Sequence, residues 1–135
     1  MLLASAICSC SEKQPETTEP MITKTEIQVE NGLLTPEIMH RLGKVGDVQV
    51  SPNHAKILYG VSYTSIEQNK GNRELYLMNV DGSENVKITN TPKSESNARW
   101  INDSQIIYMR SGKLYTATIE GSTLKNEKEV AGAEG

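Results

Sequence analysis

The chain has 135 residues, a formal net charge of −3 and a pI near 5.4, which excludes the basic surface of nucleic-acid-binding domains. Hydrophobic residues make up 36% of the sequence and aromatic residues 4%, without a single Phe. This composition is lean for one independent core, so it favours either a loosely packed domain or part of a larger one.

The first ten residues resemble a clipped secretion signal that ends in a lipid-attachment motif. A short apolar run, residues 1–7, precedes Cys8 and Cys10, but no basic segment precedes that run. Cys10 suits a bacterial lipobox better than Cys8, because small Ser9 stands before it and aliphatic Ile7 stands three positions earlier. The alternative is a pair of free thiols. A transmembrane helix is excluded because no apolar run approaches about 18 residues.

Residues 11–32 are rich in Glu, Thr and Pro, and this composition predicts a disordered tether. Residues 33–46 follow as a short helical lead-in. Thr35 is a suitable N-cap, Pro36 occupies the favoured first helical position, and Gly43 ends a helix over residues 36–42. Leu34 and Leu42 then share one face with Ile38, and we expect this face to pack on a later element.

Four short strands are predicted over residues 47–93, in up-and-down order. Residues 47–50 alternate in polarity and end at a Ser-Pro-Asn turn, and residues 56–63 are β-branched and aromatic. Residues 73–80 lead into Asp81-Gly82, a strong hairpin signal, and residues 85–89 supply the partner strand.

The same pattern repeats over residues 94–135. Residues 98–100 match the first strand, "QIIYMRS" echoes "KILYGVS", and "KLYTATIEGS" echoes "ELYLMNVDGS". A repeat of about 40–50 residues with four strands is typical of a β-propeller blade. The fourth strand of the second unit, near residues 128–130, is doubtful, so this blade is expected to be incomplete.

The predicted fold class is therefore all-β: a partial β-propeller of about two four-stranded antiparallel blades. A blade needs a neighbour on each face, and closed propellers contain four to eight blades, so we expect a fragment with exposed apolar faces or an unusual two-blade protein. The side chains expected to be most buried are Trp100, Leu75, Leu77, Ile106 and Tyr108.

The segments "TPEIMHRLGKVGDVQVSP" and "NVDGS…SESNARW" resemble the N-terminal propeller of secreted bacterial serine peptidases of the prolyl oligopeptidase family. The resemblance covers residues 33–122, and the helix leading straight into the first strand is its more specific part. His54 departs from the family, which usually has Gly in the turn after Ser-Pro. Much of the strand pattern is shared with the propeller of the Tol-Pal system.

The resemblance implies a C-terminal hydrolase domain with a Ser-Asp-His triad, whose Ser lies on a Gly-x-Ser-x-Gly elbow. That pentapeptide does not occur in these 135 residues. His40 falls in the short helix and His54 in a turn, so neither is expected to be catalytic. We therefore predict no catalytic residue, and no peptide hydrolysis by this chain alone.

Three polar stretches remain as candidate sites. In the dipeptidyl branch of the family, paired propeller glutamates hold the free amine of the substrate, and Glu67 is the weak candidate here because it stands alone in a polar loop. The stretch "DGSEN" lacks the third acidic position and the distant Glu of a calcium loop, and "SESN" is more typical of turns. No metal or cofactor is predicted.

The sequence thus favours a propeller segment of a secreted peptidase, which controls the access of peptides to a hydrolase domain. Its expected partners are that domain, further blades and peptides, with contact to the membrane only through a lipid on Cys10. The expected location is the cell envelope, either secreted or periplasmic. The alternatives are a non-catalytic binding propeller of the Tol-Pal type and a small lipoprotein interaction module.

Overall fold

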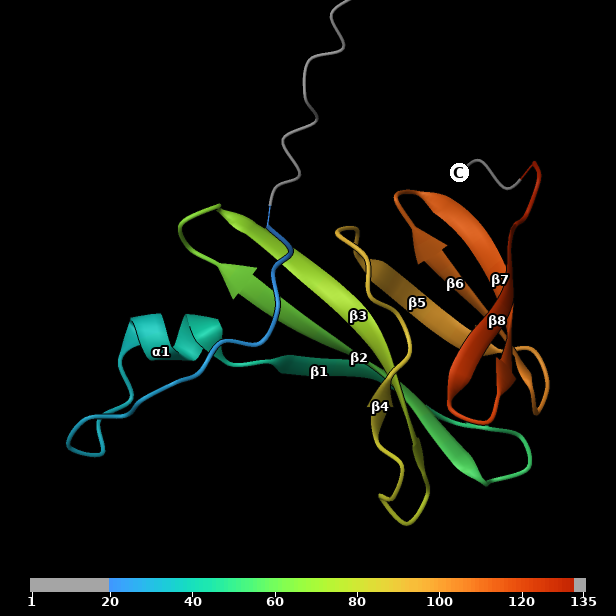
Figure 1. Ribbon diagram of the computed structural model, residues 1–135, viewed down its shortest axis with the longest axis horizontal. Coiled ribbons are helices and arrows are strands. Elements are labelled where there is room, and N and C mark those ends of the chain that lie inside the picture. The colour runs from blue at the N-terminus through green and yellow to red at the C-terminus, as the bar shows by residue number, and fades with distance from the viewer. Residues whose placement is uncertain (1–19, 133–135) are drawn as a thin grey trace, which may run out of the picture.

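The computed structural model describes residues 20–132 as two four-stranded antiparallel sheets preceded by one short helix (Figure 1). The sheets follow each other in the chain without exchanging strands, and this arrangement is compatible with two blades of a partial propeller. The elements are α1 (Pro36–Arg41), β1 (Lys44–Val50), β2 (Lys56–Ser65), β3 (Lys70–Asn79), β4 (Val86–Lys87), β5 (Glu95–Trp100), β6 (Gln105–Arg110), β7 (Lys113–Glu120) and β8 (Thr123–Glu129).

Blade 1 has the order β1-β2-β3-β4, which confirms the predicted meander. Its centre is the long β2–β3 hairpin, in which ten residues of each strand are paired in unbroken register. Asp81-Gly82 forms the expected turn after β3. Gly82 has a φ of 85°, a conformation that favours glycine. The carbonyl of Ser83 closes the turn by accepting a hydrogen bond of 2.9 Å from the amide of Asn79.

Blade 2 has the order β5-β6-β7-β8 and contains all four strands. The expectation of a doubtful fourth strand was wrong, because β8 pairs with β7 from Glu120↔Thr123 to Tyr115↔Glu129. Gly121, with a φ of 62°, forms the tight turn between them. This turn is the second copy of the repeated sequence "DGS/EGS", and both copies do end the third strand of a blade.

A matching bulge shows that the two blades share backbone geometry beyond the strand order. The register shifts between Gly46 and Gln49 in β1, and between Ser96 and Arg99 in β5. Asp47 and Asn97 occupy equivalent places in these bulges, with φ values of 52° and 53°. Asp and Asn tolerate this left-handed conformation better than most residues, which explains their use here.

Each blade has two faces, and the core forms where one face of blade 1 meets the opposite face of blade 2. Face B of blade 1 carries Leu58, Leu75 and Leu77, which are 0%, 0% and 1% exposed. Face A is the opposite side, defined in blade 2 by Ala98, Trp100, Ile106, Tyr108, Ala117 and Ile119. Face B of blade 1 and face A of blade 2 together make one hydrophobic cluster.

Four of the five residues predicted to be most buried lie in this cluster, namely Leu75, Leu77, Ile106 and Tyr108. Trp100 is the exception, since it is only half-buried at the margin of the cluster. Its indole Nε1 donates a hydrogen bond of 3.4 Å to the carbonyl of Gln49 in β1. Trp100 therefore joins the two blades, as expected of an inter-blade residue, but from the edge of the interface.

The other two faces have no covering blade among residues 20–132. Face A of blade 1 exposes Val48, Val50 and Val80 by 59%, 52% and 51%. Their equivalents in blade 2 are Ala98 and Ile119, which are 1% and 7% exposed, and the half-buried Trp100. The same sequence pattern is thus buried where a neighbouring blade is present and exposed where it is absent.

The helix α1 begins as predicted, but its apolar face is not buried. The Thr35 hydroxyl accepts a hydrogen bond of 3.3 Å from the amide of Ile38 at the N-cap, and Pro36 is the first helical residue. Leu34 and Leu42 are 57% and 43% exposed, so the expected packing of this face on a later element was wrong. The helix lies beside the hairpin of blade 1 rather than on a core (Figure 1).

Residues 20–32, which the sequence assigned to the tether, contain no helix or strand. Met21, Ile22 and Ile27 are half-buried within this segment, and Gln68 donates a hydrogen bond of 3.4 Å to the carbonyl of Pro20. The predicted lipobox and the first part of the predicted tether lie outside the described residues. No helix within residues 20–132 is long and apolar enough to cross a membrane.

Candidate functional site

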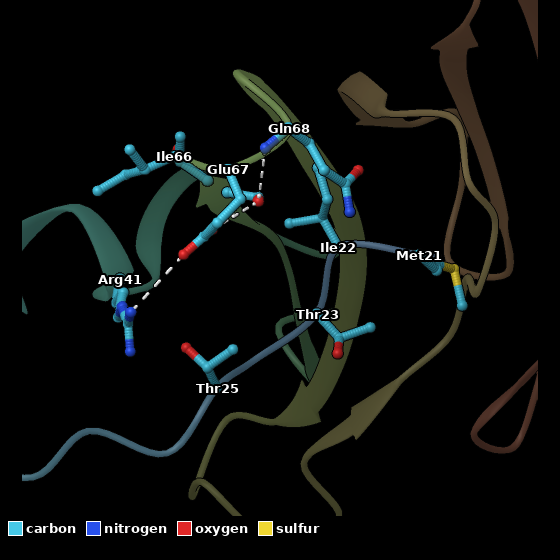
Figure 2. A pocket seen from close by; sticks show the side chains of 10 residues that line it. Met21, Ile22, Thr23, Thr25, Arg41, Ile66, Glu67 and Gln68 are labelled. Carbon is cyan, nitrogen blue, oxygen red and sulfur yellow. Dashed lines mark hydrogen bonds and ion pairs between the residues drawn. The ribbon is translucent and has the colours of Figure 1, made fainter. Parts of the chain in front are cut away.

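The candidate site is a hollow of about 240 Å³ at the tip of the β2–β3 hairpin, where the segment before α1 passes beside that tip (Figure 2). The polar loop of this site connects β2 and β3. Ten residues of each strand are paired, so the loop lies at the far end of a long hairpin. The ten lining residues come from three places in the chain and are Met21, Ile22, Thr23, Thr25, Arg41, Thr64, Ser65, Ile66, Glu67 and Gln68.

Glu67, the predicted amine contact, lies in this hollow and is held by its own loop. Its Oε2 accepts a hydrogen bond of 3.0 Å from the Ser65 hydroxyl, which also accepts the amide of Gln68 at 3.2 Å. Its Oε1 lies 3.8 Å from Nη2 of Arg41 (Figure 2). A backbone hydrogen bond of Glu67 and then the Ser65 hydroxyl hold the pKa of this carboxyl below its ordinary value, so it is ionised at neutral pH.

This geometry can attract an ammonium group only weakly. The Glu67 side chain is 75% exposed, and an exposed ion pair contributes little free energy because water screens it. Arg41 already provides a positive neighbour. Among residues 20–132 there is no group of three His, Cys, Asp or Glu side chains that could hold a metal ion.

Sequence reasoning missed a second polar constellation, which lies beside the blade interface. Arg110, at the end of β6, holds two carboxylates: its Nε lies 2.6 Å from Oε1 of Glu95, and its Nη1 lies 2.5 Å from Oε1 of Glu127. The guanidinium also lies over the rings of Tyr108 and Tyr115, at 5.5 and 5.1 Å from their centroids. One cation thereby ties β5, β6, β7 and β8 together.

The constellation continues into blade 1 through the connection between the blades. The Thr91 hydroxyl donates a hydrogen bond of 2.7 Å to Glu95, and the Thr91 amide donates one of 3.0 Å to Glu74 in β3. Glu74 also accepts the Thr89 hydroxyl at 2.6 Å. Glu74 and Glu95 are 4% and 0% exposed, so these bonds replace part of the hydration that the carboxylates have lost, although Oε2 of Glu95 has no hydrogen-bond partner among the described residues.

The pKa values in this constellation move in opposite directions. Burial, more than any other cause, raises the pKa of Glu95, whereas the Arg110 hydrogen bond lowers that of Glu127. The Tyr108 hydroxyl donates a hydrogen bond to Glu127. Burial, and then this hydrogen bond, raise the pKa of Tyr108. Glu74 and Glu95 lie inside the fold, and the Arg110 side chain is only 14% exposed, so this part of the arrangement is suited to fixing the two blades in register.

The other predicted positions fall outside both constellations. His40 lies on the last turn of α1 and His54 in the turn before β2, and both are exposed. His54 has a φ of 61°, the left-handed region that favours the Gly usual at this place. Asp81 accepts hydrogen bonds from the amide and hydroxyl of Ser83, at 2.9 and 2.5 Å, so "DGSEN" serves as a turn. Cys10 lies outside the described residues.

No family model matches the chain. A search of curated proteins found two similar chains, both named Dipeptidyl-peptidase 5. That of Porphyromonas endodontalis is 31% identical over 97 residues, which is 72% of this chain and 13% of the relative. That of Porphyromonas gingivalis is 35% identical over 80 residues, which is 59% of this chain and 12% of the relative. The chain is therefore similar to a segment of dipeptidyl-peptidases that spans only about an eighth of their length.

Proposed function

We propose that this chain is the N-terminal propeller segment of a secreted serine exopeptidase, and that it limits the access of peptides to a hydrolase domain elsewhere in the protein. The observation that carries the proposal is the similarity of 72% of the chain to a dipeptidyl-peptidase. The two-blade architecture supports it, because a blade with an uncovered apolar face requires a further blade beside it.

In this proposal the blades form a barrier in front of the catalytic pocket and take no part in the catalytic reaction. Face-to-face packing makes a stiff unit, and the buried Glu74–Thr91–Glu95 connection keeps neighbouring blades in register. A ring of such blades in front of a catalytic pocket would admit short or unfolded peptides and exclude folded proteins. Its partners would be the hydrolase domain, further blades and the peptide substrate.

We propose Glu67 as a contact for the free amine of a substrate. Its ionised carboxylate and its place at an exposed hairpin tip support that role, while Arg41 at 3.8 Å opposes it. The Glu67→Gln change in the complete protein would raise KM for peptides with a free N-terminus and leave N-acylated peptides unaffected. Equal changes for both substrates would exclude the amine contact.

The N-terminal motif is the basis for a proposal about the cellular location of the protein. We propose a cell-envelope protein, secreted or periplasmic, that is anchored through a lipid on Cys10. Support comes from Ile7, Ser9 and Cys10, which have the spacing of a lipobox. The polar residues after Cys10 would then hold the blades away from the membrane surface.

The test uses both the 135-residue chain and the protein encoded by its complete reading frame. The complete protein should release dipeptides from short chromogenic substrates, lose this activity after treatment with a fluorophosphonate, and leave folded proteins intact. The chain alone should do none of this. A complete protein that binds no fluorophosphonate would overturn the proposal and favour a non-catalytic binding propeller.

A further inference from the structure

Glu95 is a buried carboxyl group with an incomplete set of partners, at the place where the connection between the blades enters β5. Its side chain is 0% exposed. Oε1 lies 2.6 Å from Nε of Arg110 and 2.7 Å from the Thr91 hydroxyl, whereas Oε2 has no hydrogen-bond partner among residues 20–132. A buried carboxylate needs hydrogen bonds on both oxygens to balance the loss of its water, so the ionised form of Glu95 is costly here.

The Thr91 hydroxyl has one proton but faces two acceptors. The carbonyl of Lys93 lies at 2.6 Å and Oε1 of Glu95 at 2.7 Å. While Glu95 is ionised, the hydroxyl can donate to only one of them, and the other pair of oxygens meets without a proton between them. A proton on Oε1 of Glu95 removes this conflict, because Glu95 then donates to Thr91 and Thr91 donates to Lys93.

Arg110 does not hold its two carboxylates equally. Its Nη1 and Nη2 donate to the two oxygens of Glu127, at 2.5 and 3.0 Å, whereas only Nε reaches Glu95. Such bidentate pairs are the stronger ones, and the Glu127 side chain is 35% exposed, so it keeps part of its water. Of the two carboxyl groups, Glu95 is therefore the one that gains from a proton.

The other ionisable groups around Glu95 come from both blades. They are Glu74 of β3, Tyr108 and Arg110 of β6, and Glu127 of β8. Burial raises the pKa of Glu95 most and the charge of Glu74 adds to this, while the hydrogen bonds from Thr91 and Arg110 act in the opposite direction. A groove of about 400 Å³ beside the cluster, lined in part by Thr91, Arg110 and Glu127, gives protons from water a route to it.

We propose that Glu95 and Thr91 form a proton switch between the blades, in which Glu95 takes up a proton in mild acid before Glu127 does. The Thr91 hydroxyl then turns from Glu95 to the carbonyl of Lys93, so the connection between the blades keeps its hydrogen bonds and loses a buried charge. The blade interface is consequently more stable in mild acid than at neutral pH.

The switch is a property of this interface and not of the blade pattern. The pair Glu95↔Arg110 stands two residues before the bulge of β5, where blade 1 has Val45↔Val61 before the bulge of β1. The valines cannot titrate, so the strand pairing itself requires no charge at this place. The inference concerns the packing of the two blades and holds whether or not the chain belongs to a peptidase.

The first test reads the protons directly. The carboxyl carbons of the ¹³C-labelled 135-residue chain are assigned by through-bond NMR and followed while the pH is lowered from neutral. The carbon of Glu95 should change at a pH above 4.5, the ordinary value for glutamate, and the carbon of Glu127 at a pH below it. A Glu95 midpoint at or below that of Glu127 would overturn the proposal.

The second test measures the effect on stability, through the urea midpoint between about pH 7 and about pH 5. The folded chain binds a proton at Glu95 that the unfolded chain lacks in this range, so the midpoint of the wild type should rise as the pH falls. Glu95→Gln imitates the protonated form, because its amide can donate to Thr91 and accept from Arg110. This variant should be at least as stable as the wild type at pH 7 and should lose the rise.

Glu127→Gln is the matched control, because it makes the same change in the other carboxylate that contacts Arg110. It should lower the urea midpoint at pH 7 and keep the rise in mild acid, and comparison of the three proteins cancels every other group that titrates in this range. If Glu95→Gln instead lowered the midpoint at pH 7 as much as Glu127→Gln and kept the rise, Glu95 would be needed as an anion and the switch would be excluded.

Discussion

Truncation of Leu75 should destabilise the chain far more than truncation of its equivalent in the second blade. Leu75 is 0% exposed at the centre of the blade interface, whereas Leu114, at the same position of blade 2, is half-buried. The change Leu75→Ala removes three buried carbons, at about 0.8 kcal/mol for each, and leaves a cavity between two sheets that cannot easily collapse.

These contributions give a loss of about 3 kcal/mol in the free energy of unfolding for Leu75→Ala. For Leu114→Ala we expect about 1 kcal/mol, because water already reaches that side chain and little cavity forms. The assay is urea unfolding followed through the fluorescence of Trp100, which is the one tryptophan of the sequence and lies beside the interface. Measurement at about 1 µM keeps weak association between copies out of the comparison.

Equal losses in the free energy of unfolding for Leu75→Ala and Leu114→Ala would refute this reasoning. It would mean that face B of blade 2 is as well covered in the isolated monomer as face B of blade 1. A loss below about 1 kcal/mol for Leu75→Ala would likewise contradict a packed interface between the blades.

Three further perturbations test other features. The hydrogen bond from Arg110 holds the pKa of Glu127 below its ordinary value of 4.5, so the unfolded chain binds more protons in acid and stability should fall as the pH drops below about 5. Glu127→Gln should flatten this fall in acid titrations followed by circular dichroism, and parallel curves would contradict it. His54→Gly should raise the free energy of unfolding by about 0.5 to 1 kcal/mol in urea titrations, because the φ of 61° suits glycine; a loss would show that the His54 side chain matters. Behind a complete signal sequence in a bacterial host, Cys10→Ala should release the protein from membrane fractions and Cys8→Ala should not; equal release would refute the choice of cysteine.

The features that the sequence predicted well are those set by local chemistry. The Thr35 cap and the Asp81-Gly82 turn depend on a few neighbouring residues, and both appear where expected. The strands with apolar alternation were also found, because one side of each faces the cluster between the blades. β8 was missed for the same reason: only Leu124 of its seven residues packs against the cluster, so it has no hydrophobic period to detect.

The features that were missed depend on contacts between distant residues. Leu34 and Leu42 have helical spacing, but the spacing alone cannot reveal whether an element lies opposite them, and none buries them. Arg110 is fifteen residues from Glu95 and seventeen from Glu127, so only the register of three strands brings the charges together. The proximity of Arg41 to Glu67 depends in the same way on where α1 lies beside the hairpin.

Hydrogen exchange measures most directly whether the two blades pack into one cooperative unit. Amides of the β2–β3 hairpin and of the β6–β7 hairpin should open with the same free energy, and Leu75→Ala in blade 1 should reduce protection in both hairpins to the same extent. If Leu75→Ala weakened protection in blade 1 alone and left β6 and β7 unchanged, the blades would be independent sheets and the propeller interface would be contradicted.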